Sequence, residues 1–180
     1  MLRSWRAADA PLLKRAIDES LEHLRPWMPW ALSEPTPLEA LAKRLEGFAA
    51  EFAAGKNWLY GIFTPDERAV LGAAGLHPRI GPAGLEIGYW IRSGATRRRY
   101  ATEAAYALTV AAFGRPDVER VEIHCDPRNL ASAGIPRVLG YRLAETLRNN
   151  TVTPDGAPRD TMVWRVGRAE WTARAPASIS

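Results

Sequence analysis

"LEIGYWIRSGATRRRYATEAAYALTVAAFGRPDVERVEIHC", residues 85–125, changes its hydrophobic periodicity twice. Leu85–Arg92 and Arg120–Cys125 have the short, largely apolar pattern of strands, whereas the apolar residues of Tyr100–Phe113 recur at helical spacing until Gly114. A strand, a helix and a strand in this order predict a right-handed crossover between parallel strands. The loop before the helix then lies at the carboxyl end of the first strand, where open α/β sheets bind ligands.

The start of this central helix is the first candidate binding site. A helix start attracts anions because its first N–H groups have no helical partner and carry about half a positive charge. Three consecutive arginines, Arg97, Arg98 and Arg99, occupy this position. Their guanidinium groups can fork onto phosphate oxygens. The same side chains can instead fill the space that a phosphate needs, or form a solvated loop without a ligand, so the sequence leaves these alternatives open.

The residues before this unit predict two helices and further strands. A short N-terminal strand leads into a helix over residues 10–24, with Asp9 as its N-cap. Thr36 and Glu39 have the spacing of a capping box at the start of a second helix, with Pro37 at its first position. Strands are then expected on both sides of a proline-containing turn, and with the strand at residue 85 they form an antiparallel meander over residues 58–64, 69–78 and 85–92.

The residues after the central unit predict a short helix and two strands. The helix spans residues 130–140 and ends at Gly140, and the strands cover residues 141–148 and 160–166 around a loop at 149–158. The resulting order is β-α-α-β-β-β-α-β-α-β-β, which predicts a mixed α/β layer fold. We expect one domain over residues 1–166 and a loosely held tail over residues 167–180.

Composition limits the classes of function. The 180 residues are 47% hydrophobic and carry a formal net charge of +4, which fits one globular domain and only mildly favours anionic ligands, so nucleic-acid binding is not expected. Cys125 is the only cysteine and therefore cannot form an intrachain disulfide or a cysteine-based zinc site. The histidines lack metal-ligand spacing and are expected to pack or face solvent: His23, His77 and His124. No stretch has the ~20 apolar residues of a membrane span, and a cytoplasmic protein is expected.

Several of these segments together resemble the GNAT acetyltransferase superfamily. The resemblance lies in "EIGYWIRSGATRRRYATEAAYALTVAAF" and "VERVEIHCDPRNLASAGIPRVLGYRL", and it extends to "HLRPWMPWA", "GLHPR" and "RDTMVWRV". It covers most of the chain up to about Val166 and is closest to the branch that acetylates N-termini of ribosomal proteins. It implies a mixed, mostly antiparallel sheet flanked by helices, with a splayed parallel strand pair that forms a cleft for acetyl-coenzyme A.

The resemblance also implies which residues hold the coenzyme. The pantetheine arm is expected against the backbone near Trp90, Ile91 and Arg92. The pyrophosphate is expected at the helix start, against Arg97, Arg98, Arg99, Tyr100, Ala101 and Thr102. The family loop usually reads Arg/Gln-x-x-Gly-x-Gly/Ala, and only Ala101 fits that pattern. Arg97 and Arg99 stand where glycine is usual, and glycine permits backbone angles and close approaches that other residues disfavour.

Acetyl transfer needs a deprotonated amine, so a base must accept a proton. Glu86 is the candidate, because a carboxylate in an apolar strand is costly unless it has a task or a partner, and many members carry a catalytic glutamate on this strand. The alternative is a structural, ion-paired glutamate. By the same resemblance, a backbone N–H near Ile91 holds the oxyanion that develops during transfer.

The N-x-x-S pattern of Asn129 and Ser132 matches coenzyme-contacting residues of this branch, in which the serine is proposed to protonate the departing thiolate. The alternative is an ordinary helix start, with Asn129 as its N-cap. Other members use a tyrosine in this helix, and this chain has Pro136 there instead, which predicts a kink or break. Trp27 and Trp30 lie between prolines and either line the acceptor site or fill a core.

The expected function is therefore acetyl-coenzyme A-dependent N-acetyl transfer to a peptide N-terminus or a small amine, without a metal. Members of the family are often dimers, so the resemblance also implies a homodimer. A non-catalytic binding or sensing relative is the alternative, and the arginines at the usual glycine positions favour it.

Overall fold

The computed structural model describes residues 1–153 and 156–171, which form one seven-stranded sheet in the order β1-β2-β3-β4-β5-β7-β6. Each strand pair is antiparallel except β4 and β5. The strands are β1 (Leu2–Ser4), β2 (Trp58–Phe63), β3 (Val70–His77), β4 (Gly84–Ile91), β5 (Arg120–Cys125), β6 (Arg142–Val152) and β7 (Pro158–Gly167). The predicted meander and parallel crossover are confirmed.

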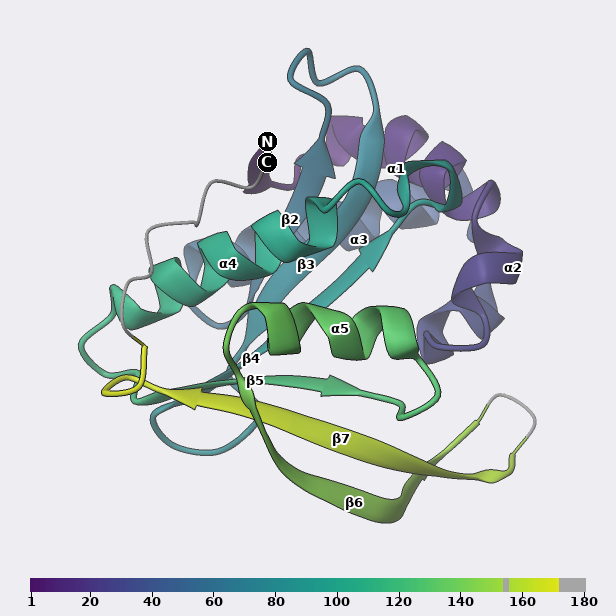
Figure 1. Cartoon of the computed structure of the whole chain (residues 1–180). Helices are drawn as coiled ribbons and strands as arrows, with labels where there is room; N and C mark the ends of the chain where they lie inside the picture. Colours follow the sequence, from purple (N-terminus) through teal and green to yellow (C-terminus); the bar gives the residue numbers. More distant parts are fainter. Residues whose placement is uncertain (154–155, 172–180) are drawn as a thin grey trace.

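Helices cover both faces of the sheet (Figure 1). They are α1 (Ala10–Asp18), α2 (Leu21–Leu24), α3 (Leu38–Ala53), α4 (Tyr100–Phe113) and α5 (Leu130–Val138), with 3-10 turns η1 (Ala7–Asp9), η2 (Pro29–Ser33) and η3 (Ser93–Ala95). The crossover helix α4 buries Ala105, Leu108 and Ala112 in one core with β4 and β5. On the opposite face, α1 and α3 enclose a second core with β2 and β3, centred on Leu45 and Phe63.

The predicted helix over residues 10–24 is wrong in its length, because it is interrupted between α1 and α2. At the interruption the Ser20 hydroxyl donates to the Ala16 carbonyl at 2.7 Å. It also accepts a hydrogen bond from the Ser93 amide at 3.0 Å. Serine competes in this way with helical hydrogen bonding, and here it ties the end of α1 to the loop after β4.

The predicted capping box at Thr36 is also wrong. Helix α3 begins at Leu38, with Pro37 as its N-cap and no side-chain cap. The Thr36 hydroxyl accepts from Arg44, and the Thr36 amide donates to the Glu34 carboxylate, so both groups have partners that the capping pattern does not reveal.

Helix α1 has Asp9 as its N-cap, as predicted, but the Asp9 carboxylate makes no capping bond to α1. It accepts hydrogen bonds from the Arg3 guanidinium and the Arg6 amide instead.

The last two strands extend beyond their predicted bounds. Strand β6 continues to Val152, so part of the predicted loop at 149–158 belongs to the sheet. After β7, Trp171 packs against Phe113 and Tyr106 of α4, with ring centroids 6.0 and 5.8 Å apart. Of the predicted tail, residues 172–180 lie outside the described residues.

Candidate functional site

The site begins where the parallel strands separate. β4 pairs with β5 only over Gly84–Glu86 and Arg120–Glu122, although β4 continues to Ile91 and β5 to Cys125. The predicted splayed strand pair is therefore confirmed. Beyond Glu86, the edge of β4 that faces β5 is open.

Strand register shows which backbone groups face this opening. The Arg92 amide donates to the Leu71 carbonyl at 2.8 Å, so Arg92 belongs to a hydrogen-bonded pair with β3. Backbone groups of alternate residues point to opposite sides of a strand. Those of Tyr89 and Ile91 therefore point toward the gap, as the predicted oxyanion contact near Ile91 requires.

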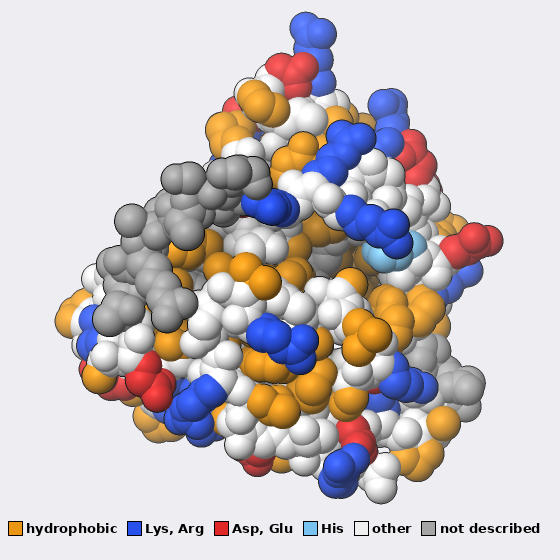
Figure 2. Space-filling view, in the orientation of Figure 1, with side chains coloured by type: hydrophobic (Ala, Val, Ile, Leu, Met, Phe, Trp, Pro, Cys, Tyr) orange, Lys and Arg blue, Asp and Glu red, His pale blue; other side chains and the backbone are white. Residues whose placement is uncertain are grey.

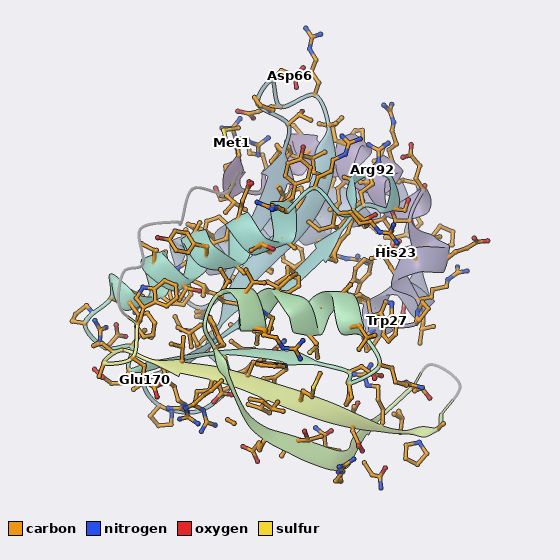
Figure 3. All side chains as sticks on the ribbon, in the orientation of Figure 1. Met1, His23, Trp27, Asp66, Arg92 and Glu170 are labelled. Carbon is orange, nitrogen blue, oxygen red and sulfur yellow. The ribbon has the colours of Figure 1, made fainter. Side chains whose placement is uncertain are left out.

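A cavity of about 560 Å³ occupies this side of the gap. It is lined by nearly the whole predicted coenzyme set: Trp90, Ile91, Arg97, Arg98, Arg99, Tyr100, Ala101, Thr102, Asn129 and Ser132. The exception is Arg92, whose guanidinium pairs with Glu19 at 2.5 Å. Figure 2 shows this face hollowed between the helices, with Lys and Arg side chains on the rim and hydrophobic side chains inside. In Figure 3, Trp27 lies beside one end of α5 and His23 lies above it, on α2; both residues also line the cavity.

Two of the three arginines before α4 have the backbone conformation that glycine favours. Arg97 and Arg99 adopt positive φ angles of 61° and 63°, the conformation that glycine takes most readily. All three arginines are exposed to solvent, and all three line this cavity. The glycine-type backbone path is thus kept, although arginine occupies it.

The first turn of α4 offers donors to an anion at this position. The Glu103 amide makes the first α4 bond, to the Arg99 carbonyl at 2.9 Å. The amides of Tyr100, Ala101 and Thr102 precede it and therefore have no partner within the helix. The cavity, the loop path and these amides fit a pyrophosphate.

A second cavity of about 780 Å³ lies on the α1 and α3 side of the sheet. Trp27 and Trp30 both line it, so the structure places both in a cavity wall. The Trp30 ring packs at a tilt on Trp90 with centroids 5.8 Å apart. The two cavities meet along shared lining residues: Trp27, Met28, Tyr89, Trp90, Asn129 and Ser132.

Glu86 faces the second cavity as half of an ion pair. Glu86 is 7% exposed, and its carboxylate accepts two hydrogen bonds from Arg79, at 2.8 and 2.5 Å. Burial acts to raise the pKa of Glu86, but the Arg79 bonds and the nearby positive charges outweigh burial and lower the pKa. Glu86 is thus ion-paired, as the structural alternative predicted, and it also lies at the cavity wall.

His124, which was expected from the sequence only to pack or face solvent, lies next to Glu86. Its Nε2 is 2.8 Å from the Glu122 carboxylate, and its Nδ1 is 3.7 Å from Glu86. Arg165 in turn donates to Glu122 at 2.6 Å. The i, i+2 spacing of Glu122 and His124 in a strand was the available signal, because it places both side chains on one face.

Ser132 and Asn129 lie at the junction of the cavities. The Asn129 side chain accepts a hydrogen bond from the Ser132 amide at 3.0 Å, so Asn129 is the N-cap of α5, as one of the two interpretations predicted. Asn129 also lines both cavities. The Tyr89 hydroxyl lies 3.1 Å from the Ser132 carbonyl and 3.2 Å from the Ser132 hydroxyl. Tyr89 was not predicted as a site residue from the sequence. Pro136 lies inside α5 without ending it, and the helix continues to Val138.

Within the described residues, no cluster of three or more His, Cys, Asp or Glu side chains is suited to hold a metal ion. None of the helices in that part of the chain is long and apolar enough to cross a membrane.

Comparisons with known proteins agree with this geometry. The family model described as "Acetyltransferase (GNAT) domain" matches residues 1–142. No curated protein matches the sequence significantly. Among solved structures, the chain is similar to RimL, a ribosomal L7/L12 alpha-N-protein acetyltransferase in complex with coenzyme A, which forms a disulfide with a cysteine of that protein. The TM-score is 0.82 at 20% identity, with 92% of each chain covered.

Two further structures are similar. One is the ribosomal-protein-S5-alanine acetyltransferase of Vibrio fischeri, with a TM-score of 0.80, 18% identity, and 95% of this chain and 94% of that chain covered. The other is the microcin C7 self-immunity acetyltransferase MccE in complex with acetyl-CoA and AMP, with a TM-score of 0.83, 16% identity, and coverage of 92% and 91%.

Proposed function

The chain belongs to the GNAT acetyltransferase family, and from this premise we propose that it transfers the acetyl group of acetyl-coenzyme A to a primary amine by direct attack. The observation that carries the proposal is the pair of cavities that meet at the gap between β4 and β5. A donor bound on the α4 side and an acceptor bound on the opposite side reach each other only at this junction.

The coenzyme-side cavity supplies the contacts that the donor needs. The amides at the start of α4 bind the pyrophosphate, and the exposed arginines add positive charge at the rim. The backbone of Tyr89 and Ile91 faces the gap and accepts the pantetheine arm. A backbone N–H of this segment binds the thioester oxygen, where negative charge develops during transfer. The bound coenzyme supplies the activated acetyl group.

The acceptor-side cavity supplies a destination for the amine proton. We assign this role to Glu86 together with His124, because both line the cavity and their facing atoms are 3.7 Å apart. Glu122 holds His124 through Nε2, which leaves Nδ1 directed at Glu86. This pair then accepts a proton that arrives through water, and Arg79 keeps the carboxylate in place.

The acceptor is proposed to be a peptide N-terminus or a small amine. The tryptophan wall of Trp27 and Trp30 gives an apolar surface for the part of the acceptor next to its amine. Similarity to two acetyltransferases of ribosomal proteins supports a peptide N-terminus. The homodimer and the cytoplasmic location stay predictions.

Two measurements test the proposal. Acetyl-coenzyme A should raise the melting temperature, because a ligand that binds only the folded chain stabilises it. A screen of peptides and small amines should then reveal an acceptor that releases free thiol. No shift at saturating acetyl-coenzyme A would refute the proposal. A shift without thiol release from any amine would instead identify the non-catalytic binding protein that the altered loop suggested.

A further inference from the structure

Pro136 leaves one carbonyl of α5 without its usual helical hydrogen bond. A residue four positions after Ser132 would normally donate its N–H to the Ser132 carbonyl. Pro136 occupies that position and has no N–H. The Tyr89 hydroxyl, which reaches α5 from β4, lies 3.1 Å from the same carbonyl and supplies a donor there. A side chain 43 positions away in the sequence thus takes over a helical hydrogen bond.

The same hydroxyl reaches a second group of Ser132. Its oxygen is 3.2 Å from the Ser132 hydroxyl oxygen. When the Tyr89 O–H is the donor in both contacts, it is shared between the carbonyl and hydroxyl oxygens of Ser132, and the serine keeps its own proton for another acceptor. Asn129 holds the Ser132 amide at 3.0 Å. The amide, the carbonyl and the hydroxyl of Ser132 therefore each have a neighbour that restricts them, at the place where the two cavities join.

We propose that Tyr89 is a positioning residue for Ser132: its hydroxyl binds the carbonyl that Pro136 leaves free and thereby holds the serine hydroxyl at the cavity junction, toward the coenzyme thiol. This inference rests on the proposed function. In the step concerned, the serine O–H bond breaks and its proton joins the departing thiolate. The serine oxygen then takes a proton from a water molecule, and the hydroxide left behind takes the proton that the acceptor amine released. Tyr89 keeps its own proton throughout. Burial raises the pKa of Tyr89, in agreement with this passive role.

Tyr89→Phe tests the inference because it removes only the hydroxyl. Tyr60→Phe is the matched control, since Tyr60 is a half-buried tyrosine on β2 that lines neither cavity. A readout that does not depend on acetyl transfer is the ionisation of coenzyme A in its complex, followed by thiolate absorbance against pH. Because a donated Ser132 proton favours the thiolate, Tyr89→Phe should raise the thiol pKa in the complex, whereas Tyr60→Phe should leave it unchanged.

Turnover gives the second readout. Tyr89→Phe should lower kcat by about tenfold, somewhat less than the loss of a proton-transfer group itself, with little change in KM. In a Ser132→Ala background, Tyr89→Phe should add no further loss, because Tyr89 acts through Ser132. An equal loss in both backgrounds, or an unchanged thiol pKa in Tyr89→Phe, would overturn the inference.

Pro136→Ala tests the origin of the arrangement. This substitution restores a backbone N–H that can donate to the Ser132 carbonyl, so the loss of melting temperature caused by Tyr89→Phe should shrink in the Pro136→Ala background. The same loss in both backgrounds would refute the link between Pro136 and Tyr89. If coenzyme A itself causes no melting shift in the unmodified chain, the proposed function fails and the inference fails with it. A normal shift combined with an unaffected thiol pKa defeats the inference alone.

Discussion

Arg97 has a conformational cost that glycine would not have, and Arg97→Gly should therefore stabilise the protein. Arg97 has a φ of 61° in the loop before α4. An L-residue in the left-handed region brings its Cβ close to the following carbonyl oxygen, and glycine has no Cβ. The side chain is exposed, so the substitution removes no buried contact.

The expected size follows from two opposing terms. The left-handed conformation costs a non-glycine residue about 1–2 kcal/mol, and glycine loses about 0.5–1 kcal/mol of additional chain freedom on folding. The net gain in the free energy of unfolding is therefore about 0.5–1 kcal/mol, which raises the melting temperature by about 1–4 °C for a domain of this size.

Arg98→Gly is the matched control in the same loop. Arg98 is also exposed but has no positive φ, so replacing it with glycine relieves no backbone strain. The substitution only adds chain freedom to the unfolded state, which costs about 0.5–1 kcal/mol, and the melting temperature of Arg98→Gly should therefore fall. Thermal and urea unfolding of both variants measure the difference. A lower melting temperature for Arg97→Gly, equal to that of Arg98→Gly, would refute the argument from backbone conformation.

Arg97→Gly should also separate the two roles of the loop. If the backbone amides bind the pyrophosphate and the arginines only add charge at the rim, acetyl-coenzyme A should still raise the melting temperature of the variant. At low ionic strength, Arg97→Gly should bind acetyl-coenzyme A more weakly than the unmodified chain does. This difference in affinity should narrow as salt is added, because salt screens exposed charges. A complete loss of binding would show that the Arg97 side chain itself forms the anion site.

Three further predictions concern the site and the sheet around it. Glu86→Gln should lower kcat by about 10²-fold with little change in coenzyme affinity, as expected for a lost base. Because the pKa of Glu86 is lowered in the folded protein, the ionised carboxylate should stabilise the fold at neutral pH and lose this effect as acid protonates it. The free energies of unfolding of Glu86→Gln and the unmodified chain, measured in urea, should therefore converge at low pH. Cys125 is buried and its thiol pKa is raised by that burial, so it should react slowly with a small disulfide reagent at neutral pH and faster as the pH rises; mass spectrometry measures the adduct, and rapid labelling at neutral pH would contradict the argument. Gly72→Ala should lower the free energy of unfolding by about 1–3 kcal/mol, because the added Cβ would approach the Trp90 carbonyl across the β3–β4 pair. Gly47→Ala in α3 is the control: nothing lies within 4 Å of the added Cβ, so this variant should raise the free energy of unfolding by about 0.5–1 kcal/mol. A change of the same sign in both variants would contradict the packing argument.

Local pattern was sufficient for the central unit of the fold. The change from strand to helix periodicity and back over residues 85–125 predicted the crossover and the parallel pair, because periodicity depends on which face of each element is buried. The same reasoning failed at Ser20 and Thr36, where a side chain found a partner in another turn or element in place of the nearby backbone. Local patterns do not report partners that are brought close only by folding.

The sequence by itself determined the residue types of the candidate site and their order: a helix start after a strand, a glutamate in that strand, and an N-x-x-S start of the next helix. Only the tertiary structure decided how these groups are used. It separated β4 from β5 after three paired residues, placed Arg79 on Glu86, and brought the Tyr89 hydroxyl to the carbonyl that Pro136 leaves without a helical donor. The physical reason is that hydrogen bonds and ion pairs form between atoms about 3 Å apart in space, whereas periodicity and propensity describe only neighbours along the chain.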